Sequence, residues 1–338
     1  MEKTAAIIGM GRMGVRHAQA VQASGLKLVA LADSKAENLT RACDELKLPA
    51  TLAFSSLDEG FFKAKPDLVI IATTANAHAD LTVRCAVEGI AYILCEKPMA
   101  VSVADCDRMI EACEKSGSVL SINHGLRYMP KFARARDWLR EGRIGEFASM
   151  AVIAGEGGLS MKGVHYIEAF AQLAGSPFAR AWGRLHEPSV ANPRGAEFRD
   201  ESGCAFWETE NGKRLHLEMG RGVGLGCSVV YAGSHGQIVV NEVTGTAEIT
   251  ARRAEDWDLP GNRYNSKPVV TRFDLEPMDV MKAAAALVSN LLNGGEVPTA
   301  PEAREAVRAV GAAIHSSELD GTLVPVGSLS NERRFAWA

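Results

Sequence analysis

The sequence has no long apolar run, no excess of basic residues and no cysteine pair of the C-x-x-C type. Nothing in its 338 residues approaches the ~20 consecutive apolar residues that span a bilayer, so we expect no membrane segment. The net charge of -4 and the pI near 6.1 exclude the basic surface typical of proteins that bind nucleic acid. The first residues, MEKTAAIIGMG, also lack the apolar core and cleavage site of a secretory signal.

The cysteines and histidines show no pattern that would hold a metal or a disulfide framework. The chain has seven cysteines, an odd number, and His186, His216, His235 and His315 lack the short spacing of metal ligands. Free cysteine is among the most buried residue types. We therefore interpret the cysteines as buried thiols of a protein in the reducing cytoplasm, and we expect no metal site.

The composition is that of a globular protein, with 47% hydrophobic and 23% charged residues. A chain of 338 residues is long for a single core, so two domains are expected. The pattern changes near residue 120. We place a dinucleotide-binding domain at residues 1–123 and a second domain, which binds substrate and forms oligomers, at residues 124–338.

In the first domain, short apolar runs alternate with helical patterns. The predicted strands are Ala5–Gly9, Lys27–Asp33, Asp67–Thr73, Ala91–Cys95 and Val119–Asn123. Runs this rich in Val, Ile and Leu are typical of strands buried on both faces of a parallel sheet. Ser34 is predicted to cap a helix over 35–46 and Ser102 to cap one over 103–115. Alternation of strand and helix predicts an α/β Rossmann domain with a doubly wound parallel sheet.

In the second domain, strand-like segments dominate after residue 178, and helices are predicted near 131–141, 163–173, 279–292 and 301–317. Asn211-Gly212 between two of the segments is a strong signal for a hairpin. We predict an α+β domain with a largely antiparallel, open-faced sheet. Val229, Tyr231, Ile238 and Val240 are predicted to lie on its open face and to be covered by a second copy, in a homodimer or homotetramer. The tail Arg334–Trp337 is predicted to dock on a neighbouring subunit.

A glycine-rich turn follows the first predicted strand and opens a helix. Gly9 makes the tight turn, Gly11 lets the backbone approach a pyrophosphate, and Gly14 lets helix and strand pack closely. The helix N-terminus then offers N–H groups and a positive dipole end to the phosphates. Asp33 ends the second strand 19 residues after Gly14, a spacing that suits an acid bonded to the adenosine ribose.

Asp33 also bears on the choice of cofactor. A carboxylate at this place would repel the 2′-phosphate of NADP, which favours NAD, although Lys35 leaves NADP possible. Arg12, Met13 and Ser34 complete the candidate cofactor-binding residues of this region, and Arg12 could equally be a solvated charge.

Further motifs follow in order along the chain. Thr73, Thr74, Asn76 and His78 follow a strand, and Glu96-Lys97-Pro98 follows the next. His17 follows the glycine turn, and 123–130 read N-H-G-L-R-Y-M-P. This combination resembles the glucose–fructose oxidoreductase, inositol 2-dehydrogenase and MocA-type oxidoreductase family.

The resemblance implies a role for each matching position. Lys97 would be the active-site lysine beside the nicotinamide, Pro98 would follow a cis peptide bond, and His165 would be the catalytic histidine. Candidate cofactor-groove residues are Thr73, Thr74, Asn76, His78, Glu96 and Lys97, and candidate substrate-binding residues are His124, Arg127, Tyr166 and Glu168. The family often has an acid four residues before the histidine, where this chain has Met161.

Oxidation of a secondary alcohol needs a base for the hydroxyl proton and a cation for the developing alkoxide. Histidine suits the first task because its pKa lies near neutrality, and a lysine ammonium suits the second. We therefore predict an NAD-dependent oxidoreductase acting on a hydroxyl of a sugar, cyclic polyol or nucleotide sugar, such as a nucleotide-sugar 3-dehydrogenase. Two alternatives stay open, namely an enzyme that uses tightly bound NAD in a closed redox cycle and a non-catalytic NAD-binding sensor.

Overall fold

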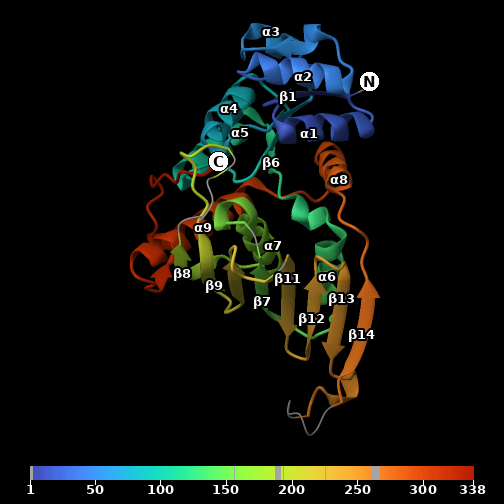
Figure 1. The fold of residues 1–338 in the computed structure, drawn as a ribbon, viewed down its shortest axis with the longest axis vertical. Coiled ribbons are helices and arrows are strands. Elements are labelled where there is room, and N and C mark those ends of the chain that lie inside the picture. The colour runs from blue at the N-terminus through green and yellow to red at the C-terminus, as the bar shows by residue number, and fades with distance from the viewer. Residues whose placement is uncertain (1–2, 156, 187–191, 193, 225, 260–266) are drawn as a thin grey trace. The chain divides into compact units, whose positions relative to one another are not determined.

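The chain folds into two compact units in a computed structural model that describes residues 3–155, 157–186, 192, 194–224, 226–259 and 267–338 (Figure 1). The first unit contains the described residues up to Gly125 together with 279–307 and 331–338. The second contains 126–278 and 308–330. Our domain boundary, which put every residue after 123 into the second domain, is therefore wrong for the two segments that return to the first unit.

The first unit is built on a six-stranded sheet in the order β3-β2-β1-β4-β5-β6, with every pair of strands parallel. This is the doubly wound sheet that the sequence predicts. The chain order reverses between β1 and β4, so their carboxyl ends border the crevice where ligands of such sheets bind. The strands are β1 (Thr4–Ile8), β2 (Lys27–Ala32), β3 (Ala53–Phe54), β4 (Leu68–Ile71), β5 (Tyr92–Cys95) and β6 (Val119–Ile122).

The helices of the first unit are α1 (Arg12–Ala23), α2 (Ala36–Leu46), α3 (Glu59–Lys63), α4 (Ala75–Val87), α5 (Val103–Ser116) and α8 (Val280–Asn293). Ser102 caps α5 as predicted, with its hydroxyl accepting a hydrogen bond of 3.1 Å from the Asp105 N–H. The predicted cap of α2 is wrong, because Lys35 and not Ser34 precedes the helix, and its side chain makes no capping bond.

Two distant segments complete the first unit. Helix α8 packs beside α1 and buries Leu287, Val288 and Leu291. The tail is held to the segment after β5 by a hydrogen bond of 2.8 Å from the Phe335 N–H to the Val101 carbonyl, and Trp337 is 1% exposed. The prediction that this tail docks on a neighbouring subunit is therefore wrong, because it packs on its own chain.

The second unit is built on a nine-stranded sheet in the order β14-β13-β12-β11-β7-β10-β9-β8-β15. Pairing is antiparallel except between β7 and β10, so the predicted largely antiparallel sheet is confirmed. The Asn211-Gly212 turn joins β9 and β10, as predicted. The strands are β7 (Phe147–Ala154), β8 (Phe178–His186), β9 (Ser202–Thr209), β10 (Arg214–Met219), β11 (Cys227–Gly233), β12 (Gly236–Asn241), β13 (Thr246–Ala251), β14 (Val269–Asp274) and β15 (Val324–Pro325).

Helices α6 (Pro130–Arg140) and α7 (Val164–Ala174) cover one face of this sheet (Figure 1). Helix α9 (Ala300–Glu318) contributes to the first unit up to Val307 and to the second unit from Arg308. The four side chains that we placed on the open face, Val229, Tyr231, Ile238 and Val240, are all buried within the chain. That assignment is wrong because alternation along a strand shows two faces but does not say which one the helices cover.

All seven cysteines are free thiols and six of them are buried, which agrees with their interpretation as buried thiols. Burial raises the pKa of Cys85 to about 12 and that of Cys113 to about 11, so neither is a thiolate near neutral pH. Within the part of the chain that the structure describes, no helix is both long and apolar enough to cross a membrane.

Candidate cofactor and active site

The turn between β1 and α1 has no room for larger side chains at two of its three glycines. Gly9 has φ +93°, and a Cβ there would lie 2.7 Å from the Ala72 carbonyl oxygen at the end of β4. A Cβ on Gly14 would lie 1.8 Å from the Gly9 oxygen. These two glycines therefore let the turn, the helix and β4 pack against one another.

Gly11 differs, because a Cβ built on it would have no protein atom within 4 Å. It precedes α1, whose N-terminus has no side-chain cap and no acidic residue in its first turn. Uncapped N–H groups beside open space fit a dinucleotide pyrophosphate. The structure thus fits the predicted use of Gly9, Gly11 and Gly14, and exposed Arg12 and partly exposed Met13 begin the helix at this place.

Asp33 lies just past β2, and its carboxylate is already oriented by three bonds. Its Oδ2 accepts from the Met10 N–H at 2.7 Å and from Asn38 Nδ2 at 3.2 Å, and its Oδ1 accepts from the Lys35 N–H at 2.8 Å. A carboxylate has about four lone-pair sites, so one more donor, such as a ribose hydroxyl, can be accepted. Ser34 beside it is exposed.

Arg41 also lies near Asp33, although the sequence motifs do not single it out. Its Nη2 donates to the Met10 carbonyl at 3.2 Å and to Asn38 Oδ1 at 3.0 Å. No local signal could have found it, because Arg41 is on the second turn of α2 and not next to Asp33 in the chain. Arg41 thus places a positive charge near Asp33.

The segment after β4 is tied to the segment after β5 by a buried histidine. His78 lies with Nδ1 3.0 Å from the Pro98 oxygen and Nε2 3.3 Å from the Thr73 oxygen. Burial lowers the pKa of His78, so the ring is neutral and donates to one of these oxygens at a time. Thr74 Oγ1 donates to Asn76 Oδ1 at 2.7 Å. The cofactor contacts of these four residues stay predictions.

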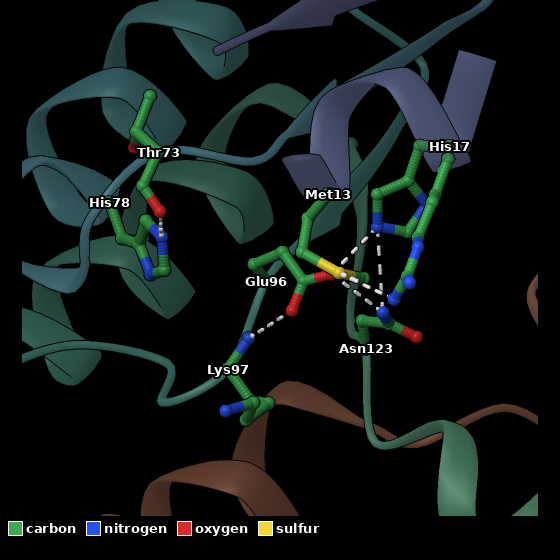
Figure 2. Close-up of polar contacts among 8 residues, drawn as sticks. Met13, His17, Thr73, His78, Glu96, Lys97 and Asn123 are labelled. Atoms are coloured by element: carbon green, nitrogen blue, oxygen red, sulfur yellow. Dashed lines mark hydrogen bonds and ion pairs between the residues drawn. The ribbon is translucent and has the colours of Figure 1, made fainter. Parts of the chain in front are cut away.

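Glu96 at the end of β5 is the centre of a buried polar group formed with His17 of α1 and Asn123 after β6 (Figure 2). Its Oε1 lies 2.7 Å from His17 Nε2 and accepts from Asn123 Nδ2 at 2.8 Å. Its Oε2 accepts from the Lys97 N–H at 3.2 Å. We predicted Glu96 as a groove residue, and the structure gives its carboxylate these scaffold contacts.

Two opposing effects act on the pKa of Glu96. Burial raises it, but the hydrogen bond and charge of His17, the charge of Lys97 and the hydrogen bond of Asn123 together lower it well below the ordinary value. Glu96 is therefore a buried carboxylate near neutral pH.

Lys97 follows this group, and its peptide bond to Pro98 is cis, as the resemblance implies. Its side chain is partly exposed and runs away from the carboxylate of Glu96 (Figure 2). The backbone at Lys97 is held by Glu96, and the carbonyl of Pro98 lies against His78. The lysine thus projects from a rigid base at the carboxyl end of a parallel strand, where ligands of this sheet type bind.

Of the remaining predicted residues, His124 belongs to the first unit, and Arg127, Tyr166 and Glu168 belong to the second. His124 is fully buried in the first unit. In the second unit, Arg127 and Glu168 form a buried ion pair, and the buried Tyr166 hydroxyl donates to the Glu242 carboxylate at 3.1 Å. These contacts fasten α7, and substrate contacts of these residues stay predictions.

His165 is the second residue of α7 and is partly exposed. It belongs to the second unit, whereas Lys97 belongs to the first. Glu168 is one turn further along α7, but its carboxylate is paired with Arg127. Among the residues that the structure describes, no group of three or more His, Cys, Asp or Glu side chains could hold a metal ion.

Residues 3–124 match the model of an oxidoreductase family with an NAD-binding Rossmann fold, the GFO/IDH/MocA family. The match covers about a third of the chain and lies within the first unit. The resemblance drawn from the motifs is thereby confirmed, and so is NAD as the cofactor of this type of domain.

Curated relatives match over part of their length. The inositol 2-dehydrogenase of Salmonella typhimurium is 32% identical over 149 residues, which are 43% of this chain and 44% of the relative. The D-apiose dehydrogenase of Paraburkholderia graminis is 34% identical over 146 residues, 41% of this chain and 37% of the relative. The chain thus spans less than half the length of these family members.

A solved structure matches over nearly the whole chain. An Agrobacterium radiobacter oxidoreductase in complex with NAD+, L-tartaric acid and magnesium superimposes with a TM-score of 0.80. The match covers 97% of this chain and 99% of that one at 20% identity. At this identity the likeness establishes the fold, including that of the second unit.

Replacing Gly11 with alanine is expected to weaken NAD binding without unfolding the protein. The new methyl group meets no protein atom but occupies the space beside the helix N-terminus. We expect the free energy of unfolding to change by less than about 1 kcal/mol and the affinity for NAD to fall about 10- to 100-fold. Urea denaturation and calorimetric titration with NAD measure the two quantities.

Gly14→Ala is the contrasting variant, because its methyl group would overlap the Gly9 oxygen and should destabilise the fold itself. Wild-type NAD affinity in Gly11→Ala would show that the pyrophosphate does not approach this turn.

Replacing Glu96 with glutamine is expected to make the free energy of unfolding depend less on pH in the acidic range. The pKa of Glu96 is lower in the folded than in the unfolded chain, so its charge stabilises the folded state above the unfolded value of about 4.3. This stabilisation is lost as the pH falls from about 4.3 toward the folded pKa. Urea denaturation at a series of pH values between about 6 and about 3 measures the loss.

Glu45→Gln, which removes an exposed carboxylate of α2, is the control and should follow the wild-type profile. A Glu96→Gln profile parallel to the wild-type one would mean that the folded pKa of Glu96 is not lowered.

Proposed function

We propose that this protein is an NAD-dependent oxidoreductase that transfers hydride between nicotinamide and a secondary hydroxyl of a sugar or cyclic polyol. The observation that carries the proposal is Lys97, which projects from a rigid base at the carboxyl end of β5 in a domain of an NAD-binding family. Bound nicotinamide supplies the hydride chemistry, and the protein supplies orientation and charge.

Lys97 and His165 have different roles toward the substrate. The Lys97 ammonium stabilises the negative charge that develops on the substrate oxygen. His165 takes the hydroxyl proton in the direction of oxidation and returns it in the direction of reduction. Glu96 keeps the lysine in place, because its carboxylate binds the Lys97 N–H at 3.2 Å. Its Oε1 is held by His17 and Asn123, and the charge of Lys97 helps to keep the carboxylate ionised.

The substrate class rests on the relatives. The curated relatives act on inositol and on D-apiose, a cyclic polyol and a sugar. A nucleotide sugar stays among the candidate substrates, although no described residue favours it specifically. We also propose the cytoplasm as the compartment, because the cysteines are free thiols.

The decisive experiment follows reduced-nicotinamide absorbance with purified protein and a panel of sugars, cyclic polyols and nucleotide sugars, with NAD and NADP in parallel. Lys97→Ala is expected to lower kcat about 10²- to 10³-fold, since it removes the charge opposite the alkoxide. His165→Ala should lower it about 10²- to 10⁴-fold, since it removes the base. Lys115→Ala, which removes an exposed lysine of α5, is the matched control.

Wild-type turnover in Lys97→Ala would rule out Lys97 as the residue that stabilises the charge on the substrate oxygen. An absence of turnover with every candidate, together with NAD that stays bound through purification, would favour the closed redox cycle. An absence of both turnover and bound cofactor, with NAD binding on titration, would favour the sensor.

We further propose that the outer face of the second sheet forms the predicted homodimer or homotetramer. Trp182, Phe206 and Val230 share a row across this face, and Ile153 beside them is 50% exposed. Apolar side chains in a row are typical of a covered surface. Ile153→Asp should give a monomer by light scattering at micromolar concentration, while Val87→Asp in the first unit should not. A monomeric wild type would refute the proposal.

A further inference from the structure

The segment that leads into His165 has an unusual backbone. After β7 the chain forms a single π-helical turn, Leu159–Gly163, in which the Gly163 N–H donates to the Gly158 carbonyl at 3.0 Å. Helix α7 continues directly from it, and His165 follows two residues after Gly163. π-turns are rare and are frequently found at functional sites. This one is supported by a residue from outside the helix.

The support comes from Asp200, which lies 40 residues further along the chain than Ser160. Its Oδ1 accepts hydrogen bonds from the Ser160 N–H at 2.9 Å, the Ser160 hydroxyl at 2.8 Å and the Met161 N–H at 3.1 Å. Its Oδ2 accepts from the Gly158 N–H at 3.0 Å. Next to it, the Leu159 N–H donates to the Glu201 carbonyl at 2.8 Å. One carboxylate thus binds three backbone N–H groups at the start of the π-turn.

The packing around Asp200 is tight. A Cβ on Gly158 would lie 2.2 Å from Asp200 Cγ, so glycine at 158 is what lets the carboxylate reach the turn. Burial raises the pKa of Asp200, although the hydrogen bonds from Ser160, Met161 and Gly158 act to lower it. Burying a carboxylate removes its hydration, and the hydrogen bonds from these donors offset that cost.

We propose that Asp200 is a positioning residue for the base of the reaction: by holding residues 158–161, where the π-turn begins, it fixes the position of His165. The inference rests on the proposed function for the role of His165, and on the geometry of the second unit alone for the clamp. Asp200 itself acts through the turn, because its two oxygens are engaged by the backbone and by Ser160. The competing hypothesis is that Asp200 only holds the loop on which it lies.

Three variants test the clamp in the full-length protein. Asp200→Ala removes every bond, and Asp200→Asn keeps an acceptor oxygen but turns an N–H₂ group toward one of the donors. Gly158→Ala keeps the Asp200 carboxylate but pushes it away from the turn. The φ of -114° at Gly158 suits alanine. Asp320→Asn is the matched control, since it makes the same chemical change at an exposed carboxylate of the second unit.

The first readout is steady-state kinetics with the substrate found in the panel. A base displaced by about 1 Å can cost about 10²-fold in rate. We expect kcat to fall about 10²-fold in Asp200→Ala and less in Asp200→Asn, with KM changed much less than kcat. The double variant of Gly158→Ala and Asp200→Ala should lose less than the product of the single effects, because both break one contact.

The second readout does not depend on turnover. In protein labelled on its eight histidines, the ring signals of His165, identified with His165→Gln, should shift in Asp200→Ala and Gly158→Ala and stay in place in Asp320→Asn. Thermal unfolding of each variant shows whether the fold is kept.

The outcomes separate the two hypotheses. Lost turnover in Lys97→Ala with wild-type kcat and unshifted His165 signals in Asp200→Ala would overturn the clamp and leave the function intact. Shifted His165 signals with no turnover by the wild type on any candidate would support the clamp and overturn the function. A lower melting temperature with unshifted His165 signals would assign Asp200 to its own loop and overturn the proposal.

Discussion

The buried carboxylate of Glu96 joins the ends of elements that are far apart in the chain. It binds His17 from α1, the Lys97 N–H that follows its own strand, and Asn123 from the end of β6. A carboxylate without water is tolerable only with such partners, so the charge forces these ends to stay together. The position of Lys97 therefore follows from the core of the first unit and not from a surface loop. The proposed cofactor groove and the proposed active-site lysine share this base.

Much of the first unit could be predicted from the sequence because its signals are local. The glycine turn, the buried strands and the Ser102 cap each occupy a few consecutive residues, and the structure has them as expected. The prediction failed where elements are short or partners are distant. Strand β3 and helix α3 span two and five residues and carry too little pattern. The contact of Glu96 with His17 bridges 79 residues, so both residues were noticed but not their pairing.

The second unit is less predictable from the sequence, because its local patterns are weaker and its contacts join distant residues. Strand alternation predicts the sheet, but β7, with three alanines, and β8, with alanine, glycine and arginine, lack a clear strand pattern. Alternation also could not say which face lies under α6 and α7, and Val229 and Tyr231 were put on the wrong side. The family's acid is replaced by Met161, and the nearest carboxylate, that of Asp200, has no signal near 161 in the sequence.

The return of the chain to the first unit has a consequence for how the protein is made. Helix α8 and the buried Trp337 belong to the same core as β1, although more than 270 residues separate their positions in the chain. During synthesis, the surfaces of the first unit that pack on α8 and on the tail stay uncovered until residues 280–338 have been made. The second unit, which also needs residues 308–330, is closed a few residues earlier. Of the two units, the first is thus completed later, although its sheet is synthesised before that of the second, which differs from the usual order of folding during synthesis.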